Sequence, residues 1–268
     1  MKVVIITGDE DRHKFFRRFL NSHRKIKKIF AIVERSSDSQ TAKIFKEKKN
    51  KKFEHFKERE MYEKKFFHKY LKNYKDIKDK VIIKKGILNS NEKLINKIIK
   101  MKADIIFSYG CSLIKNKLIK IYRGKFVNLH LGLSPYYRGS GTNFWPLVNN
   151  EPQFLGATFM FIDEGIDTGE IVFQFRPILK NSDNCHSIGN KIIYQAAKYL
   201  PKVIKLIKSK KYKKTQYSSK VRRFYRNKDF TENAIKKMNN NFKKLMLEKY
   251  LNNKSKIDKK FKINYHFI

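Results

Sequence analysis

Short apolar runs alternate with amphipathic segments from the start of the chain. Residues 2–8, KVVIITG, and residues 29–33, IFAIV, are apolar almost throughout, and residues 11–21 between them place three phenylalanines on one side of a helix. Continuous apolar runs are typical of strands that are buried on both faces, as in a parallel sheet covered by helices. The pattern therefore predicts a strand, a helix and a second buried strand at the start of the chain.

The same alternation continues along the chain. Residues 41–74 repeat aromatic side chains at roughly helical spacing, which is typical of a helix with one face on a core. Further strands are expected at 81–86, 104–110, 125–130, 157–162 and 170–175, and further helices at 91–100 and 231–251. Alternating strands and helices predict an α/β fold with a Rossmann-like, mainly parallel sheet flanked by helices.

The composition changes near residue 208. Beyond this point the chain becomes richer in Lys and Asn, beginning with KSKKYKK, and apolar periodicity returns only in the last expected helix. We therefore expect a main domain over residues 1–207 and a basic, mostly helical C-terminal extension over residues 208–268.

The net charge is strongly positive, which bears on the class of partner. The 63 Lys and Arg outnumber the 24 Asp and Glu and give a formal charge of +39. A basic surface attracts nucleic acids and anionic membranes, yet only 12 of the 63 are Arg, the side chain suited to bidentate phosphate recognition. The lysines are spread along the whole chain, so a composition bias explains them at least as well, and nucleic acid is an alternative partner that is not favoured.

Neither the N-terminal sequence nor the cysteines indicate export. The first apolar run is too short for a signal peptide, and no apolar stretch approaches the roughly 20 residues of a transmembrane helix. The two cysteines, Cys111 and Cys185, do not form the pattern of a disulfide-bound secreted protein. We expect a cytoplasmic protein with no membrane partner and, because no metal-ligand motif is present, no metal.

Three polar residues are the candidates for chemistry. Asn128 and His130 are two apart on one expected strand, so they point to the same face. Asp167 follows in the loop GIDTG, between two further strands. An amide donor, an imidazole and a carboxylate can bind an oxyanion, orient one another and move protons. No nucleophile elbow, P-loop, G-x-G-x-x-G or H-E-x-x-H motif accompanies them.

The window from 126 to 174 resembles the catalytic domain of the folate-dependent formyltransferases. This family includes methionyl-tRNA formyltransferase, glycinamide ribonucleotide transformylase and the sugar N-formyltransferases. The matching motifs are Asn128-Leu129-His130, Pro135 followed by Arg138-Gly139, and Asp167-Thr168-Gly169, with ADIIFSYGCSLI upstream. The resemblance covers about 103–207 and makes residues 1–207 the expected formyltransferase catalytic domain.

The resemblance implies both the donor and the residue roles. The formyl donor would be N10-formyltetrahydrofolate, and Asn128, His130 and Asp167 would be catalytic. The residues expected to bind the folate are Tyr109, Gly110, Cys111, Ser112, Leu113, Ile114, Ile162, Asp163, Glu164, Gly165 and Ile166.

The acceptor amine stays open at this point. A small amine, with a nucleotide-linked amino sugar as one candidate, fits the short tail better than transfer RNA, because methionyl-tRNA formyltransferase carries a further barrel domain. The loop TGDEDRH after the first strand has three acids and is a poor phosphate cradle for glycinamide ribonucleotide. Hydrolysis of formyl-folate and a nucleic-acid-binding protein that uses the basic tail remain alternatives, and the sequence does not predict the oligomeric state.

Overall fold

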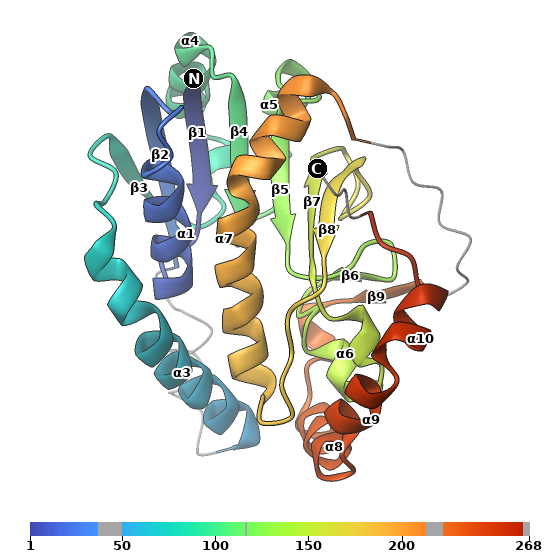
Figure 1. Cartoon of the computed structure of the whole chain (residues 1–268). Coiled ribbons are helices and arrows are strands. Elements are labelled where there is room, and N and C mark those ends of the chain that lie inside the picture. The colour runs from blue at the N-terminus through green and yellow to red at the C-terminus, as the bar shows by residue number, and fades with distance from the viewer. Residues whose placement is uncertain (37–49, 116, 213–221, 265–268) are drawn as a thin grey trace.

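A seven-stranded sheet forms the centre of the molecule (Figure 1). The computed structural model describes residues 1–36, 50–115, 117–212 and 222–264. The strands follow the order β3-β2-β1-β4-β5-β7-β8, and all neighbours from β3 to β5 are parallel, whereas β7 is antiparallel to both β5 and β8. Their bounds are β1 (Lys2–Thr7), β2 (Lys28–Arg35), β3 (Lys80–Lys84), β4 (Ile105–Tyr109), β5 (Phe126–His130), β7 (Ala157–Phe161) and β8 (Ile171–Phe175). The predicted Rossmann-like, mainly parallel sheet is confirmed.

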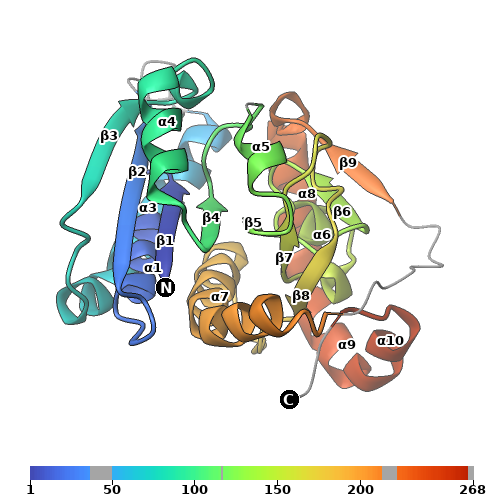
Figure 2. The ribbon, with the colours of Figure 1, turned by 90° about the horizontal axis from the view of Figure 1, so that it is seen from above.

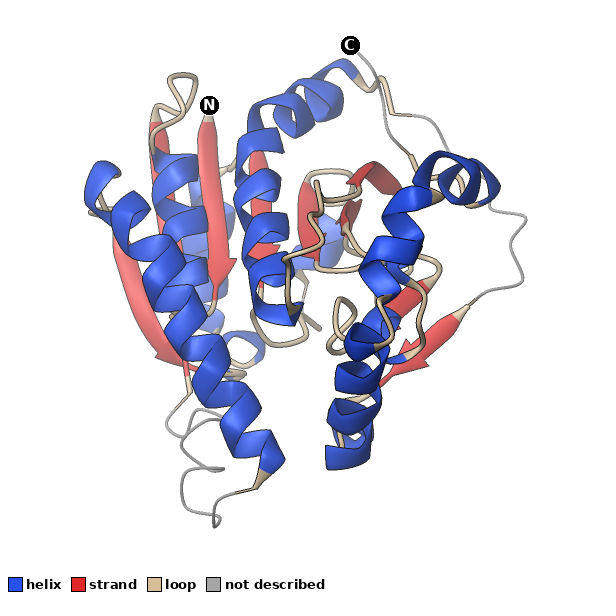
Figure 3. Cartoon of the chain, turned by 60° about the horizontal axis from the view of Figure 1, so that its bottom comes forward, coloured by secondary structure: helices blue, strands red, loops and turns tan. Residues whose placement is uncertain are grey.

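Helices cover both faces of this sheet, with strands lying between helices in Figure 3. The first face packs on α1 (Asp11–Asn21), α3 (Lys51–Asn73) and α7 (Cys185–Ser209), which contact one another, and the second on α4 (Glu92–Met101) and α5 (Leu118–Ile121) (Figure 2). Side chains of β1 alternate between the two faces of the sheet and contribute to both hydrophobic cores. Val3 and Ile5 point to one face, and Val4 and Ile6 point to the other. This explains why the strand has no polar positions between its apolar ones.

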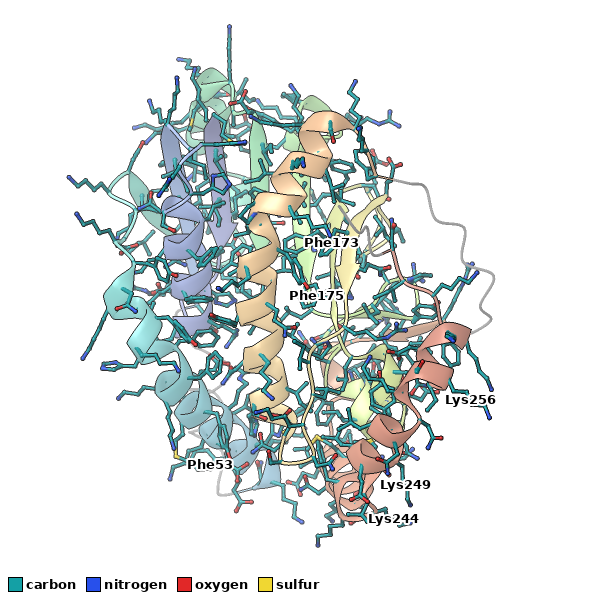
Figure 4. The ribbon with its side chains drawn as sticks, in the orientation of Figure 1. Phe53, Phe173, Phe175, Lys244, Lys249 and Lys256 are labelled. Carbon is teal, nitrogen blue, oxygen red and sulfur yellow. The ribbon has the colours of Figure 1, made fainter. Side chains whose placement is uncertain are left out.

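The long helix α7 is an element that the sequence reading did not predict. Its 25 residues begin after Asn184, whose side chain accepts hydrogen bonds from the backbone N–H groups of His186 and Ser187. This is an N-cap, and the apolar positions that follow have helical period, so both signals were available in the sequence. The helix covers β7 and β8, where Phe173 and Phe175 each lie 4.9 Å from the ring of Tyr199 (Figure 4).

The C-terminal part packs beside the end of the sheet that carries β7 and β8. It contains β9 (Arg223–Tyr225), α8 (Glu232–Lys243), α9 (Met246–Asn252) and α10 (Lys254–Lys260), and it lies against β6 (Tyr137–Gly139) and α6 (Trp145–Val148). Three short 3₁₀ helices complete the described elements, at Ile87–Asn89, Pro152–Phe154 and Asn227–Asp229. The single helix expected over 231–251 is wrong, because the chain breaks at Leu245, whose φ of 60° lies in the left-handed region.

The outer surface of this part is basic. Lys244, Lys249 and Lys256 are exposed and extend outward from α8 to α10 (Figure 4). Residues 213–221 of the basic stretch lie outside the described residues. Among the described residues, no helix is both long and apolar enough to cross a membrane.

Candidate active site

A cleft of about 950 Å³ opens at the carboxyl edge of the sheet. The strand ends Tyr109 and His130 line it, together with Asn128 and Asp167. In α/β sheets this edge is where ligands bind, because the loops that follow the strands diverge there. The three candidate catalytic residues are therefore brought to one cavity by β5 and by the loop between β7 and β8.

His130 is held from both sides of its ring. It is only 5 % exposed, and its Nε2 lies 2.9 Å from the carbonyl oxygen of Tyr137. Because a carbonyl only accepts, Nε2 carries a hydrogen and donates it. The other nitrogen, Nδ1, lies 3.3 Å from Oδ1 of Asp167. The imidazole thus has a fixed orientation and one nitrogen directed at a carboxylate.

Asp167 is fixed by its own loop. It has a left-handed φ of 52°, which Asp adopts more readily than most residues. Its Oδ2 accepts the backbone N–H of Gly139 at 2.9 Å, and its carbonyl accepts the hydroxyl of Ser134 at 2.9 Å. The loop closes tightly at Gly169, where a Cβ atom would lie 1.8 Å from the carbonyl oxygen of Phe161. The glycine-flanked turn therefore aims the carboxylate at His130.

Asn128 is oriented by a neighbour on β4. Ser108 is paired with Asn128 in the sheet, is 1 % exposed, and donates its hydroxyl hydrogen to the side-chain Oδ1 of Asn128 at 3.0 Å. With the amide oxygen engaged in this way, the amide N–H₂ group is left to face the cleft that Asn128 lines. The Asn128 amide and the His130–Asp167 pair therefore line the same cleft.

The Arg138-Gly139 motif lies on β6, which supplies backbone groups to the site. The carbonyl of Tyr137 holds His130, and the N–H of Gly139 holds Asp167. Strand β6 is in turn paired with β9 from the C-terminal part. Ser108, Ser134 and Tyr137 were not predicted from the sequence, because no local motif reveals that they lie close to the residues they contact.

The segments expected to bind the folate form one wall of the cleft. Ten of the eleven residues line it, whereas Glu164 does not. Leu113 and Ile166 are 46 % and 44 % exposed, although both are large and apolar. Tyr109 is instead 2 % exposed and packs edge-on against His13 at 4.7 Å between ring centres. This wall therefore presents exposed apolar side chains and loop backbone groups to the cleft, whereas the Tyr109 side chain is buried behind them.

Charged side chains from α1 and α3 also line the cleft, next to Tyr109. Arg12 donates to both carboxylate oxygens of Glu63 at 2.7 and 2.8 Å, and Nε of Arg59 lies 3.5 Å from the same carboxylate. Nδ1 of His13 lies 2.5 Å from Oε2 of Glu10. Burial, with Arg12 nearby, lowers the pKa of His13 to about 4. The other two acids of the first loop face cations, since Asp9 lies 2.7 Å from Arg35 and Asp11 lies 3.3 Å from Lys14, so the loop repels anions less than its sequence indicates.

A second group of titratable residues lies where α3 meets the start of α7. His55, Cys185 and His186 line the same cleft. Burial, followed by the effects of His186 and Arg59, lowers the pKa of His55 to about 3, and burial raises the pKa of Cys185 to about 12. Both cysteines of the chain are free. No metal ligand is expected from the sequence, because about half of the chain separates His55 from Cys185 and no metal-ligand motif joins them.

Comparison with known proteins decides the family. The model of the family described as formyl transferase matches residues 1–204. The chain belongs to the formyl transferase family. The convergent Asn128, His130 and Asp167 lie within the matched residues, and so does the whole predicted folate wall.

Individual formyltransferases align over shorter regions. The chain is 29 % identical over 120 residues to methionyl-tRNA formyltransferase of Desulforamulus reducens, covering 45 % of this chain and 37 % of that protein. It is 34 % identical over 100 residues to GDP-perosamine N-formyltransferase of Brucella melitensis, covering 37 % of this chain and 38 % of that protein. The chain thus matches between a third and two fifths of the length of these curated relatives.

The fold is similar to that of solved formyltransferases. An N-formyltransferase from Helicobacter canadensis, crystallised with folinic acid and dTDP-3-aminofucose, superposes with a TM-score of 0.52 at 19 % identity, covering 86 % of this chain and 73 % of that chain. At this level of identity the similarity establishes the architecture shared by the two proteins.

Proposed function

We propose that this formyltransferase moves a formyl group from N10-formyltetrahydrofolate to the amine of a small acceptor, with a nucleotide-linked amino sugar as the leading candidate. The observation that carries the proposal is the His130–Asp167 pair beside the Asn128 amide, in a large cleft at the carboxyl edge of the sheet. The formyl transferase family match and the resemblance to a GDP-perosamine N-formyltransferase support it.

The proposed catalysis needs no covalent intermediate with the enzyme. The acceptor nitrogen attacks the formyl carbon, the carbonyl becomes an oxyanion, and the bond from the formyl carbon to N10 then breaks. Asn128 donates an N–H to the oxyanion, the kind of pre-aimed donor whose removal costs about 10²–10³-fold in rate. His130 stabilises the same oxyanion through Nε2–H, which exchanges its hydrogen bond to the Tyr137 carbonyl for one to the oxyanion. The proton lost by the acceptor nitrogen ends on N10 of the folate.

Asp167 has two roles in this scheme. Its Oδ1 lies 3.3 Å from Nδ1 of His130, so its negative charge stabilises any positive charge that the imidazole gains during the reaction. Directly or through a water, it also helps the proton move from the acceptor amine towards the leaving nitrogen. The N–H of Gly139 keeps the carboxylate in place throughout.

The folate is proposed to lie on the wall made by residues 109–114 and 162–166. Leu113 and Ile166 give the flat pterin an apolar surface, and loop backbone groups can pair with its polar edge. Glu164 lies outside the cleft lining, so it is not among the proposed contacts.

The acceptor is proposed to enter along the wall of α1 and α3. Arg12 and Arg59 both lie against Glu63, and Arg12 also lies 3.4 Å from Oε1 of Glu10, so two guanidinium groups face two carboxylates at this point. Guanidinium groups recognise phosphate well, and a phosphate or diphosphate of the acceptor would compete with these carboxylates for them. We also propose a cytoplasmic location, because both cysteines are free although each lies near the surface of the cleft.

A panel of amines tests the proposal. The purified chain is incubated with formyl-folate and nucleotide-linked amino sugars, with glycinamide ribonucleotide and methionyl-tRNA as competing acceptors. We expect a formylated amino sugar, detected by its mass. Release of formate without any formylated amine would favour hydrolysis instead, and loss of this activity in His130→Ala would assign it to the cleft.

A further inference from the structure

Three side chains that can bind a metal converge at the junction of α3 and α7. His55 lies in the second turn of α3, and Cys185 and His186 are the first residues of α7. Their donor atoms all lie within 4.8 Å of one another. Both helices begin at the lower edge of the molecule in Figure 1, on the same face of the sheet. Nothing in the proposed formyl transfer uses this group.

The spacing is close to that of a zinc site. Zn–N bonds of about 2.0–2.1 Å and Zn–S bonds of about 2.3 Å place the donors of a tetrahedral site about 3.3–3.8 Å apart. The observed group therefore needs to close by about 1 Å, which rotation of exposed or half-buried side chains can supply. The side chains of His55 and Cys185 are half-buried, whereas His186 is buried and only 6 % exposed.

His186 has a buried nitrogen that makes no well-formed hydrogen bond. Within the described part of the chain, its buried Nε2 has no hydrogen-bond partner. The nearest carboxylate oxygen, Oε2 of Glu58, lies 3.4 Å away. A buried polar atom of this kind calls for a ligand or ion, because leaving it unpaired is costly.

Glu58 is placed to complete the site. It follows His55 by three residues on α3, so the two side chains lie on the same face of that helix. Its side chain is 61 % exposed, and its Oε2 already lies beside Nε2 of His186. Two imidazoles, a thiolate and a carboxylate would make four ligands for a tetrahedral ion.

Aromatic packing alone is the competing explanation. The ring of His55 lies 5.6 Å from Phe144 and 5.4 Å from Phe230, and the rings of His55 and His186 are 4.7 Å apart. These contacts account for the positions of the two rings. They do not explain why the Cys185 thiol lies beside the two rings, or why Nε2 of His186 makes no well-formed hydrogen bond. Convergence of three donor atoms is what a metal site requires.

We propose that His55, Cys185 and His186 bind a divalent transition metal ion, foremost Zn²⁺, with Glu58 as a fourth ligand. Nitrogen and sulfur donors select Zn²⁺ and its neighbours over Mg²⁺ and Ca²⁺, which prefer oxygen. The ion would join α3 to the first turn of α7 at the border of the cleft. This inference is independent of the formyl acceptor and of whether the chain transfers formyl groups at all.

Direct metal measurement tests the site. The full chain, produced without a histidine tag and stripped with a chelator, is titrated with Zn²⁺ against a chromophoric competitor and separately with Co²⁺. We expect one Zn²⁺ per chain and, with Co²⁺, a thiolate-to-cobalt charge-transfer band. Zn²⁺ should also raise the melting temperature, because an ion that binds only the native state stabilises it, whereas Mg²⁺ should not.

Matched variants locate the ligands. Cys185→Ser should abolish the charge-transfer band, and His55→Ala and His186→Ala should each weaken Zn²⁺ binding by at least about 10-fold. The controls are His68→Ala, an exposed histidine on the same helix, and Cys111→Ser, the other cysteine. If one of these variants fails to fold, the Co²⁺ spectra of the wild type and of Glu58→Gln, which changes an exposed side chain, still show whether a thiolate binds the ion. No stoichiometric Zn²⁺ in the wild type, or equal loss in the control variants, would overturn the proposal.

Discussion

Replacing Asp167 by Asn separates the charge of this residue from its shape. The amide oxygen can still accept the N–H of Gly139, and the amide nitrogen can still face Nδ1 of His130. Asn also tolerates the left-handed backbone that Asp167 adopts. The variant should therefore fold, with the imidazole in nearly the same place.

The loss of rate follows from the electrostatics of the pair. Two unit charges 3.3 Å apart attract by about 5 kcal/mol at an effective dielectric constant of about 20. The two side chains are 5 % and 11 % exposed, so solvent screens them little. If His130 becomes positive in the transition state, loss of this attraction lowers kcat by about 10³–10⁴-fold.

Three measurements on one variant check this reasoning. We expect kcat to fall as stated, folate affinity to stay within a few-fold, and the melting temperature to change little. Asp104→Asn is the matched control, because Asp104 also accepts a backbone N–H, from Lys2 at 2.7 Å, but at the opposite end of β4. A full-rate Asp167→Asn enzyme would refute the role of the charge, and a collapse in melting temperature would make Asp167 structural.

Other residues give independent tests. Ser108→Ala removes the hydroxyl that orients Asn128, so kcat should fall by about 10-fold with folate affinity unchanged, whereas equal loss of both would mean a general disturbance of β4. Because the pKa of His13 is lowered to about 4, the unfolded chain takes up a proton below about pH 6.5 that the folded chain does not. The free energy of unfolding should therefore fall as the pH drops from about 6.5 towards 4, and His13→Gln should make this fall shallower in urea titrations across that range. Leu245→Gly should raise stability by about 1 kcal/mol, because Leu245 is 54 % exposed and has a φ of 60° that glycine adopts without strain; a lower melting temperature would show that its side chain packs favourably.

Most of the sheet could be predicted because its signals are local. The apolar runs at β1, β2, β4 and β5 need no knowledge of the rest of the chain, and Asn128 and His130 share a face by strand geometry alone. The antiparallel direction of β7 and β8 could not be obtained in this way, since apolar periodicity carries no direction.

The residues that orient the catalytic candidates could not be predicted from local sequence patterns. Ser108 lies 20 residues from Asn128, and the N–H of Gly139 reaches Asp167 across 28 residues. Strand β9, which pairs with β6 behind the site, is three residues long and has no clear apolar pattern. The break at Leu245 was hidden because the apolar spacing continues through it. The division at residue 207 stays a prediction.

The fate of an isotopically labelled formyl group tests the central claim most directly. The chain is given formyl-folate labelled at the formyl carbon together with a nucleotide-linked amino sugar, and products are followed by carbon NMR and mass. The account predicts that the label appears as an N-formyl group on the sugar, at a rate that falls at least about 10²-fold in His130→Ala. Label that appears only as free formate, or transfer that persists undiminished in that variant, would contradict it.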